Sequence, residues 1–485
     1  MDAVSRYAAI EPEKYRTEAG ADLAAAVAAG TVSPVQLVEC ALAVAEGAEP
    51  TVNAYASLLR DRALREAADL EAEARTGRIR GPLHGVPIAV KDNFHYAGEP
   101  TGKGSLTTSV APEPVSAPMV DRLVRAGAIV IGKTTTPEFG WKGTGISPRT
   151  GITRNPRDPQ RNSGGSSAGS GATVATGAVP IATGTDAGGS IRIPASFCGV
   201  VGFKPTLGAI PVWPGTANET LSHAGPLTGS VRDAALVYAL TRGADSRDPQ
   251  SAYPDDRRDA PGRALRIGIV DAPFGIAPQS PVAAVFERAT AAIISATTHS
   301  ARNLRLGQPV AAEFGAVEFV AARISIPLPR SVFEAMWVTG RGLGHAGLIE
   351  AHADVMDPGL VRLLPLARRY SLAEYQAAMV RRREFTAAMF ALFDDWDLLV
   401  MPTMPGTAFA ADAEVPPGGE ADAPLPWITW TPYTYPFNIT GQPAISIPGG
   451  TAADGLPVGL QIVGPWGHDR RVLAFAAACE HALRS

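Results

Sequence analysis

The sequence predicts an α/β protein on three observations: the length of the chain, its composition, and an alternation of helical and strand-like segments. The 485 residues exceed what one simple hydrophobic core usually holds, so either two domains or one large sheet with many flanking helices is expected. Large α/β enzymes take the second form. Hydrophobic residues make up 46% of the chain and charged residues 19%, which allows a sizeable core and excludes a disordered protein.

The first part of the chain, residues 1–76, has the pattern of an N-terminal helical portion. Three helices are expected there, at 21–29, 34–45 and 60–75. Gly30 closes the first helix, and Ser33 followed by Pro34 supplies the cap and first residue of the second. The third helix is rich in alanine and charge and precedes the first predicted strand.

That strand is the apolar run from His84 to Val90, which ends on Lys91. Open α/β sheets bind their ligands at the carboxyl ends of the strands, so the run is expected to deliver this lysine to a site. Asp92 follows directly, but successive side chains of a strand point to opposite faces. The carboxylate of Asp92 is therefore not expected to keep Lys91 charged.

Further along the chain, helix and strand alternate again, with a helix at 119–126 leading into a strand at 128–132, as α/β architecture requires. Additional strands are expected at 264–270, 397–401, 444–448 and 458–463. Residues 296–329 show no clear period. Residues 406–426 are rich in Pro, Gly, Ala and acidic residues, which predicts a mobile loop.

Two serines, each in a glycine-rich loop, are the most informative feature of the chain. Ser166 lies in Ser-Gly-Gly-Ser-Ser-Ala-Gly-Ser, residues 163–170, and Ser190 lies in Gly-Thr-Asp-Ala-Gly-Gly-Ser-Ile-Arg, residues 184–192. A serine hydroxyl becomes a good nucleophile when a base removes its proton, and lysine serves as that base in Ser-Lys hydrolases. Lysine must be neutral for this, so its pKa of about 10.4 must fall by several units, which burial can cause.

The glycines of the second loop have a separate role. Without a Cβ atom, they let consecutive backbone N–H groups turn toward one point and form a nest for a developing oxyanion. The donors expected for this oxyanion hole are the N–H groups of Ala187, Gly188, Gly189 and Ser190.

With these motifs, the chain resembles the amidase signature family. The matching segments are the lysine motif at 85–92, the Gly-Gly-Ser-Ser-Ala core at 164–168, the nucleophile segment at 184–194, and the runs at 202–206, 219–226 and 436–444. Together they cover nearly the whole chain. The resemblance implies one domain over 1–485, built on a large central mixed twisted β-sheet flanked by many α-helices.

The resemblance also implies a role for each matched residue. Ser190 would be the nucleophile, Ser166 the proton relay preceded by a cis peptide, and Lys91 the base. Asp186 would help fix the nucleophile loop, and Ser167 and Arg192 would support the site.

Other interpretations of the glycine loops are weaker. A Ser/Gly run such as 163–171 is often a flexible linker, but this one continues into the apolar small-residue stretch 172–183. A phosphate-binding P-loop requires a lysine after its glycines, and none follows here. A dinucleotide-like Gly-x-Gly pair occurs at 169–171 without the expected third glycine. We therefore expect no nucleotide cofactor.

Composition limits the partners and the compartment. A net charge of −4 gives no electrostatic footprint for nucleic acid. Cys40, Cys198 and Cys479 are far apart in the sequence, and no metal-ligand spacing occurs, so neither a disulfide nor a metal is expected. No signal-peptide pattern and no run of 18 apolar residues is present, which predicts a cytoplasmic protein without a membrane partner. A homodimer is left open.

The substrate is predicted from apolar residues near the motifs. Gly140, Trp141 and Trp213 are expected to bind substrate, and Trp427, Trp430 and Tyr433 would widen an apolar cleft, although core packing is an alternative interpretation for each aromatic residue. No Arg or Lys cluster accompanies them to indicate a carboxylate-bearing substrate, although Arg149, Arg154 and Arg192 could lie nearby.

The sequence therefore predicts a serine hydrolase that cleaves C–N bonds of hydrophobic or aryl amides, with carbamates and esters as extensions. Two alternatives remain: the amidase component of a tRNA-linked amidotransferase, and a non-catalytic amide-binding relative. The presence of Lys91, Ser166 and Ser190 disfavours the second.

Overall fold

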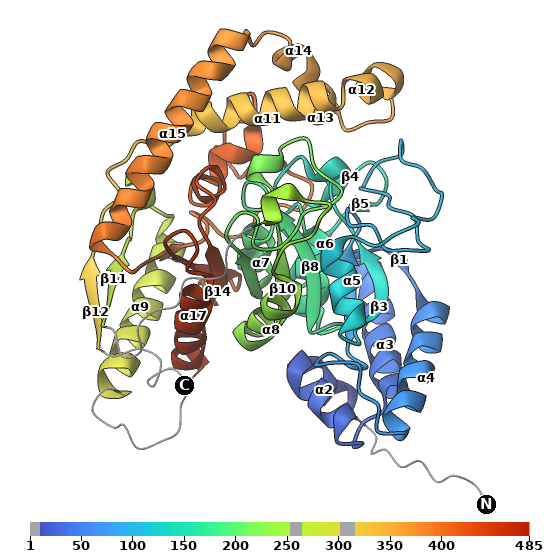
Figure 1. Ribbon diagram of the computed structural model, residues 1–485. Helices are drawn as coiled ribbons and strands as arrows, with labels where there is room; N and C mark the ends of the chain where they lie inside the picture. The colour runs from blue at the N-terminus through green and yellow to red at the C-terminus, as the bar shows by residue number, and fades with distance from the viewer. Residues whose placement is uncertain (1–9, 253–263, 301–315, 485) are drawn as a thin grey trace, which may run out of the picture.

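A mixed β-sheet forms the centre of the computed structural model, which describes residues 10–252, 264–300 and 316–484 (Figure 1). Within these residues the sheet has 11 strands in the order β1-β3-β2-β8-β10-β9-β14-β15-β13-β11-β12. The strands are β1 (Tyr55–Leu58), β2 (Pro87–Lys91), β3 (Ile129–Thr134), β8 (Ile181–Asp186), β9 (Val201–Lys204), β10 (His223–Thr228), β11 (Leu265–Ile269), β12 (Val317–Ala321), β13 (Leu398–Pro402), β14 (Ala444–Thr451) and β15 (Pro457–Val463). The prediction of a large mixed sheet is confirmed.

Apart from the antiparallel β1–β3 pair at one edge, parallel pairs lie toward the two ends of the sheet and antiparallel pairs in its middle. β3, β2 and β8 are parallel neighbours, as are β13, β11 and β12, whereas β8, β10, β9, β14, β15 and β13 pair antiparallel in turn. Because β2 and β8 run in the same direction, their last residues, Lys91 and Asp186, lie at one edge of the sheet. The serine loops continue from this edge.

Small additional elements lie outside the central sheet. Two short hairpins pair β4 (Ile146–Ser147) with β5 (Gly151–Ile152), and β6 (Arg154–Asn155) with β7 (Asp158–Asn162). The helices are α1 (Pro12–Thr17), α2 (Gly20–Ala28), α3 (Pro34–Val52), α4 (Arg60–Arg75), α5 (Pro118–Arg125), α6 (Ala168–Thr176), α7 (Arg192–Cys198), α8 (Val231–Thr241), α9 (Ser280–Ser300), α11 (Arg330–Gly344), α12 (Ala346–His352), α13 (Pro358–Val361), α14 (Leu363–Ala367), α15 (Leu372–Asp395), α16 (Pro436–Ile439) and α17 (Asp469–Arg484).

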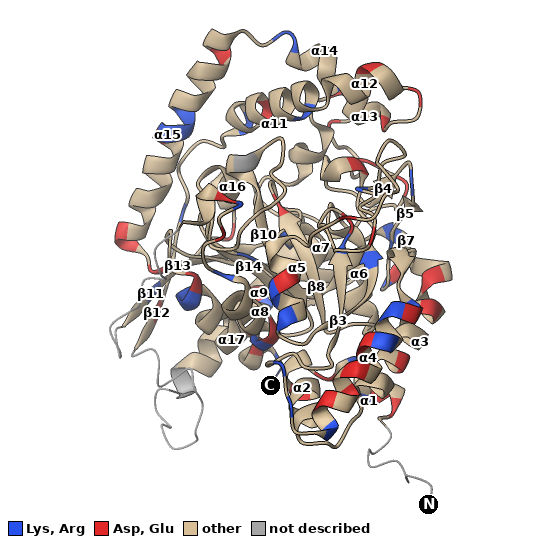
Figure 2. Cartoon of the chain, turned by 45° about the vertical axis from the view of Figure 1, so that its right-hand side comes forward, with Lys and Arg blue, Asp and Glu red and all other residues tan. Residues whose placement is uncertain are grey.

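The helices form distinct groups around the sheet. α2, α3 and α4 lie together at the lower right of Figure 1, and α11 to α15 form an outer layer at the top and upper left. Figure 2 shows acidic and basic residues interspersed along α4, which buries Ala63, Ala67 and Leu70 at helical spacing on its opposite side. Among the described residues, no helix has both the length and the apolar character needed to cross a membrane.

The N-terminal portion differs in two respects from its prediction as helices alone. β1 lies within it and pairs antiparallel with β3. The second helix continues to Val52 instead of ending at Ala45, with Pro50 accommodated in its last turn. Its start is as expected, because Ser33 accepts hydrogen bonds from the backbone N–H groups of Val35 and Gln36 and completes a capping box.

The structure describes only part of the segment 296–329, and the segment 406–426 has little regular secondary structure. Within 296–329, α9 continues to Ser300 and β12 covers Val317–Ala321, whereas residues 301–315 lie outside the described residues. The segment 406–426 contains no helix or strand up to Leu425, but its first half is tied to the β6–β7 hairpin: Asn162 N donates to Phe409 O at 2.9 Å. Its mobility stays a prediction.

Two large hydrophobic clusters fill most of the interior of the described part of the chain. The larger one surrounds the sheet, and the second lies against α11 to α15 and includes Trp141, Trp427 and Trp430. The segment after β8 contributes to both, with Ile191 in the first cluster and Ile193 in the second. The start of α7 is therefore fixed where the two clusters meet.

Candidate active site

Lys91 ends β2 fully buried among hydroxyl groups. Its exposed fraction is 0%, and its Nζ lies 2.8 Å from Ser166 Oγ, 3.0 Å from Ser167 Oγ and 2.9 Å from Thr185 Oγ1. Asp92 turns away, as predicted, and pairs with Lys133 at 3.2 Å. The lysine thus faces the first serine loop without a carboxylate in hydrogen-bond contact among its described partners.

This environment lowers the pKa of Lys91 well below 10.5. Burial is the main cause, since it disfavours the charged ammonium; Asp186 acts in the opposite direction, and the positive charge of Arg341 lowers the pKa further. A neutral lysine beside a serine hydroxyl can accept its proton. The arrangement therefore suits Lys91 to the role of a base.

The first serine loop contains a tightly packed glycine, Gly165, directly before Ser166. The peptide bond between Gly165 and Ser166 is cis, as the resemblance implied. A Cβ atom on Gly165 would lie 2.3 Å from the carbonyl oxygen of Thr144, so no larger residue fits there. Ser167 follows and its backbone N–H donates to the carbonyl oxygen of Ser190 at 3.1 Å, which joins the two serine loops directly.

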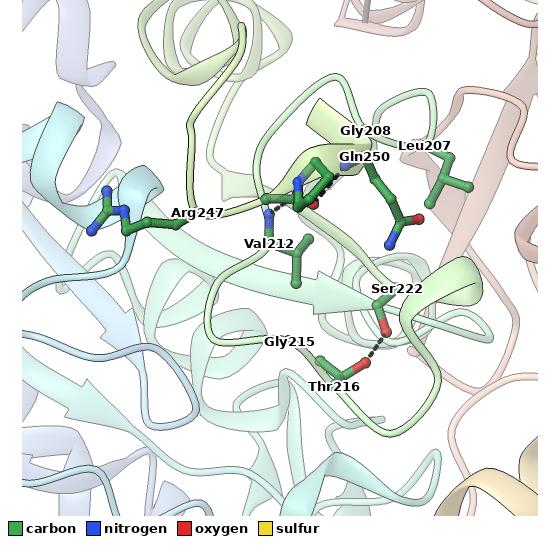
Figure 3. A pocket seen from close by; sticks show the side chains of 10 residues that line it. Leu207, Gly208, Val212, Gly215, Thr216, Ser222, Arg247 and Gln250 are labelled. Carbon is green, nitrogen blue, oxygen red and sulfur yellow. Dashed lines mark hydrogen bonds between the residues drawn. The ribbon is translucent and has the colours of Figure 1, made fainter. Parts of the chain in front are cut away.

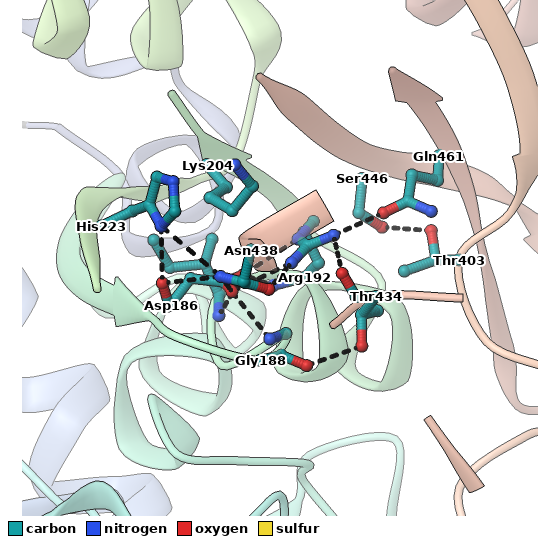
Figure 4. Close-up of polar contacts among 12 residues, drawn as sticks. Asp186, Gly188, Arg192, Lys204, His223, Thr403, Thr434, Asn438, Ser446 and Gln461 are labelled. Atoms are coloured by element: carbon teal, nitrogen blue, oxygen red, sulfur yellow. Dashed lines mark hydrogen bonds and ion pairs between the residues drawn. The ribbon is translucent and has the colours of Figure 1, made fainter. Parts of the chain in front are cut away.

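The second serine loop is organised by the carboxylate of Asp186 at the end of β8 (Figure 4). Asp186 Oδ1 accepts the backbone N–H of Gly189 at 2.7 Å, and Oδ2 accepts that of Ile191 at 3.2 Å. These two bonds draw the chain into a turn around the carboxylate and place Ser190, which is 5% exposed, between them. Asp186 thus fixes the backbone of the expected nucleophile.

Asp186 is itself held by two side chains, one of them from a distant part of the chain. Arg192 Nε lies 2.9 Å from Oδ2 and Nη2 lies 3.0 Å from Oδ1, and Asn438 Nδ2 donates to Oδ1 at 2.8 Å. Burial alone would raise the pKa of Asp186, but the Arg192 guanidinium and the other donors hold it well below its usual value. The carboxylate remains ionised, with hydrogen bonds to both of its oxygens.

One predicted oxyanion donor is directed elsewhere. The N–H of Gly189 donates to Asp186, so it is not free for an oxyanion in this conformation. The prediction that the Gly189 N–H serves as an oxyanion donor is therefore wrong for this conformation. Ala187, Gly188 and Ser190 remain as the predicted donors.

A cavity of about 130 Å³ opens beside the two serines. Ser166, Ser190, Thr185, Asn93 and Gly140 line it, together with the Pro214–Ala217 segment and Ser222, and three further residues bring positive charge or a titratable ring: Lys103, Arg341 and His345. The Oδ1 atom of Asn93 is buried and has no hydrogen-bond partner. An unpaired buried acceptor beside a nucleophile can receive a substrate N–H.

The expected aromatic lining is not observed. Gly140 lines the cavity as predicted, but Trp141 and Trp213 are not among its lining residues. Trp141 belongs to the second hydrophobic cluster, and Trp213 packs edge-on against the His95 ring at 5.6 Å and beneath the Arg247 guanidinium at 5.1 Å. Neither tryptophan lines this cavity, and a substrate-binding role for them stays a prediction.

The C-terminal aromatic residues also lie in the core instead of the cleft. Trp427 packs against Trp337 with ring centroids 5.1 Å apart, and Trp430 stacks on Phe197 at 6.1 Å. Tyr433 is buried and donates to Ile276 O at 2.6 Å. Among the described residues that line this cavity, Phe139 is the one Phe, Tyr or Trp. Two basic residues that the sequence did not place near the site, Lys103 and Arg341, line the cavity.

A second cavity of about 120 Å³ adjoins the first (Figure 3). The two share Gly215, Thr216 and Ser222, and the hydroxyls of Thr216 and Ser222 lie 2.7 Å apart. Arg247 and Gln250 line the far part. Through the shared residues, the space beside Ser190 continues toward this polar region.

Sequence reasoning did not single out Thr185, Asn438 or Arg341. Thr185 lies within the nucleophile motif at 184–194 and Asn438 within the matched run at 436–444, so a signal was present for both. Arg341 lies on α11, outside every matched segment.

Comparison with known proteins agrees with this geometry. The family model named Amidase matches residues 36–473, and the chain therefore belongs to the amidase family. A glutamyl-tRNA(Gln) amidotransferase subunit of Chloroflexus aurantiacus is 34% identical over 462 residues, 91% of each chain. An acylamidase of Rhodococcus erythropolis is 32% identical over 479 residues, 95% of this chain and 94% of the relative.

Solved structures give the same assignment. A bacterial aryl acylamidase of the amidase signature family superposes with a TM-score of 0.82 at 28% identity, covering 96% of both chains. The 6-aminohexanoate cyclic dimer hydrolase superposes with a TM-score of 0.83 at 28% identity, covering 97% of this chain and 98% of the other. The protein is thus an amidase with the amidase signature fold.

Proposed function

We propose that this chain hydrolyses amides through an acyl-enzyme on Ser190, with Ser166 as proton relay and Lys91 as base. The contact of a fully buried Lys91 with Ser166, at 2.8 Å, is the observation that carries the proposal. Ser166 and Ser190 line one cavity, so a substrate carbonyl can approach the nucleophile next to the relay.

The proton follows this relay in both directions. Ser190 Oγ attacks the carbonyl carbon while its proton passes to Ser166 Oγ and the Ser166 proton passes to neutral Lys91. The oxyanion is stabilised by the N–H groups of Ala187, Gly188 and Ser190. The proton then returns to the leaving nitrogen as the C–N bond breaks, which amides require because an amide anion leaves poorly. Water repeats the sequence on the ester and releases the acid.

The substrate class we infer is hydrophobic or aryl amides, with aryl carbamates and esters as extensions, because each presents a carbonyl with a leaving group to Ser190. The similarity to an acylamidase and an aryl acylamidase supports this class. Phe139 supplies one aromatic surface at the cavity. Steady-state rates on a 4-nitroanilide, an aryl carbamate and a small aliphatic amide test it, and a more than tenfold preference in kcat/KM for the aliphatic amide would exclude the aryl class.

The catalytic assignment is tested by covalent labelling. A fluorophosphonate should modify Ser190, as located by mass spectrometry, and Ser190→Ala should abolish labelling and lower kcat/KM by about 10⁴-fold or more. Ser166→Ala and Lys91→Ala should be similarly severe and not additive with it, because the three side chains act as a unit. Activity of Ser190→Ala within tenfold of the parent would remove Ser190 as the nucleophile.

A second candidate function is the amidase component of a tRNA-linked amidotransferase, which the 34% identity to an amidotransferase chain favours. An assay of amide hydrolysis by the purified chain, with and without added partner proteins, distinguishes the two functions. Hydrolysis by the chain alone supports the stand-alone enzyme, whereas hydrolysis that requires added partner proteins supports the amidotransferase. Absence of labelling at Ser190 would instead favour the non-catalytic relative. Light scattering on the same sample tests the homodimer.

A further inference from the structure

Arg341 brings a buried guanidinium to the cavity of the two serines. It lies in the last turn of α11, is 7% exposed, and lines the same cavity as Ser166 and Ser190. Its Nη1 donates to the carbonyl oxygen of Phe139 at 2.9 Å, and its cation lies 4.8 Å from the centre of the Trp337 ring. Its Nε is buried without a hydrogen-bond partner.

No carboxylate of the described residues pairs with this guanidinium. No ion pair involves Arg341 within the described part of the chain, and the residues that line the cavity include neither Asp nor Glu. Lys103 adds to the positive field, and His345, whose pKa burial lowers to about 4, stays neutral at pH 7. Burial lowers the pKa of Arg341 to about 10, so the side chain is still charged at neutral pH.

A buried charge without a partner is costly, and proteins rarely keep one without a counter-charge. The other buried guanidinium of the site, that of Arg192, shows the usual solution, since it is paired with Asp186 on two of its nitrogens. The contact of Arg341 with Phe139 uses one nitrogen and a neutral acceptor. The Trp337 ring contacts the cation but supplies no counter-charge. The remaining N–H donors are therefore available to an anionic group that enters the cavity.

We propose that Arg341 binds a carboxylate of the substrate, so that the enzyme prefers amides that carry a carboxylate over neutral amides of the same shape. This inference rests on the proposed function and narrows its substrate class. A guanidinium suits a carboxylate because its planar fork donates two parallel hydrogen bonds. Lys103 adds attraction from the same cavity without matching that geometry.

The test compares matched amides that differ in charge. Succinyl 4-nitroanilide is paired with butyryl 4-nitroanilide, and N-acetyl-4-aminobenzoate with 4-methylacetanilide, so the carboxylate is placed on the acyl side in one pair and on the amine side in the other. A charge-assisted hydrogen-bond pair is worth about 10- to 150-fold in binding. We expect kcat/KM to favour the acid at least tenfold in one of the pairs, and a lack of preference in both would overturn the proposal.

Variants separate recognition from packing. Arg341→Met keeps most of the length of the side chain and removes its charge, and it should reduce the acid-to-neutral ratio of kcat/KM by about 10- to 150-fold. Arg341→Lys should restore part of the ratio. Arg330→Met is the matched control, because Arg330 opens the same helix and pairs with Glu334 and Glu420 away from the cavity. An unchanged ratio in Arg341→Met would assign the arginine to packing and refute the proposal.

A turnover-independent measurement distinguishes this proposal from the catalytic one. Glutarate should slow fluorophosphonate labelling of Ser190 in the parent and much less in Arg341→Met. If labelling fails altogether, the proposed function fails. If labelling proceeds and glutarate slows neither protein or both equally, only the carboxylate site fails.

Discussion

Replacing Asp186 by Asn should both destabilise the protein and impair catalysis. The carboxylate accepts the backbone N–H groups of Gly189 and Ile191 and pairs with Arg192, and all of these groups are buried. Asn keeps the shape but presents an NH₂ group toward donors and leaves the Arg192 charge without its partner. Breaking a buried ion pair on one side costs about 3–5 kcal/mol.

The free energy of unfolding is measured by urea titration with tryptophan fluorescence, and kcat/KM on a 4-nitroanilide is measured in parallel. We expect a loss of about 3–5 kcal/mol at pH 7 and a loss of activity of more than tenfold, because the turn that carries Ser190 loses its central acceptor. The pKa of Asp186 is depressed from 3.8 in the folded protein, so its stabilising contribution is complete above that value and lost as pH falls through the folded pKa. The difference between parent and variant should therefore shrink in acid.

Asp233→Asn provides a matched control. Asp233 is also buried and accepts two backbone N–H groups, those of Gly20 and Ala21, but these partners are neutral and lie far along the chain from the serine loops. The variant should lose stability without losing kcat/KM. An Asp186→Asn protein within about 1 kcal/mol of the parent, or within tenfold of its activity, would refute the role given to the carboxylate.

Two further predictions concern the base and the cavity wall. The kcat/KM of the parent should rise with pH through an apparent pKa below 10.5, because Lys91 is active when neutral and burial lowers its pKa. If the residual activity of Lys91→Ala rises with pH through the same apparent pKa, that pKa belongs to another group. Gly140→Ala should lower kcat/KM at least about tenfold, because the added Cβ would lie 3.1 Å from Ser166 Oγ. Gly275→Ala is the control, because Gly275 has a similar positive φ but lies in open space, and this variant should lose about 1–2 kcal/mol of stability and keep its kcat/KM. Equal losses of activity in the two variants would attribute the effect to backbone strain alone.

The catalytic centre was predictable from sequence because each part of it is local. Lys91 ends an apolar strand, and Ser166 and Ser190 lie in glycine-rich loops, so strand position and motif were enough to bring them together. The residues that were missed act across long distances in sequence. Arg341 reaches the cavity only through the packing of α11, and no local pattern marks a helical arginine as buried or unpaired.

The positions of the aromatic residues could not be predicted, for a related reason. Large aromatic residues stabilise cores and bind ligands through the same apolar surface, so a tryptophan in the sequence does not reveal which it does. Here Trp141, Trp427 and Trp430 belong to the second hydrophobic cluster, which packs beside the site. The arrangement of helices in the outer layer, which no motif specifies, decides which side chains face the cavity.

The chemistry of the site depends on keeping one lysine neutral near an ionised carboxylate. Asp186 would favour a charged Lys91, but its negative charge is matched by Arg192 at 2.9 Å and shared among several N–H donors. Arg341 acts on Lys91 in the opposite sense to Asp186. Because a bound carboxylate would neutralise Arg341, binding of an acidic substrate should raise the pKa of Lys91, and the pH profile of kcat should lie at higher pH for an acidic amide than for its neutral partner. Coincident profiles for the two substrates would show that the charge of Arg341 does not reach the base.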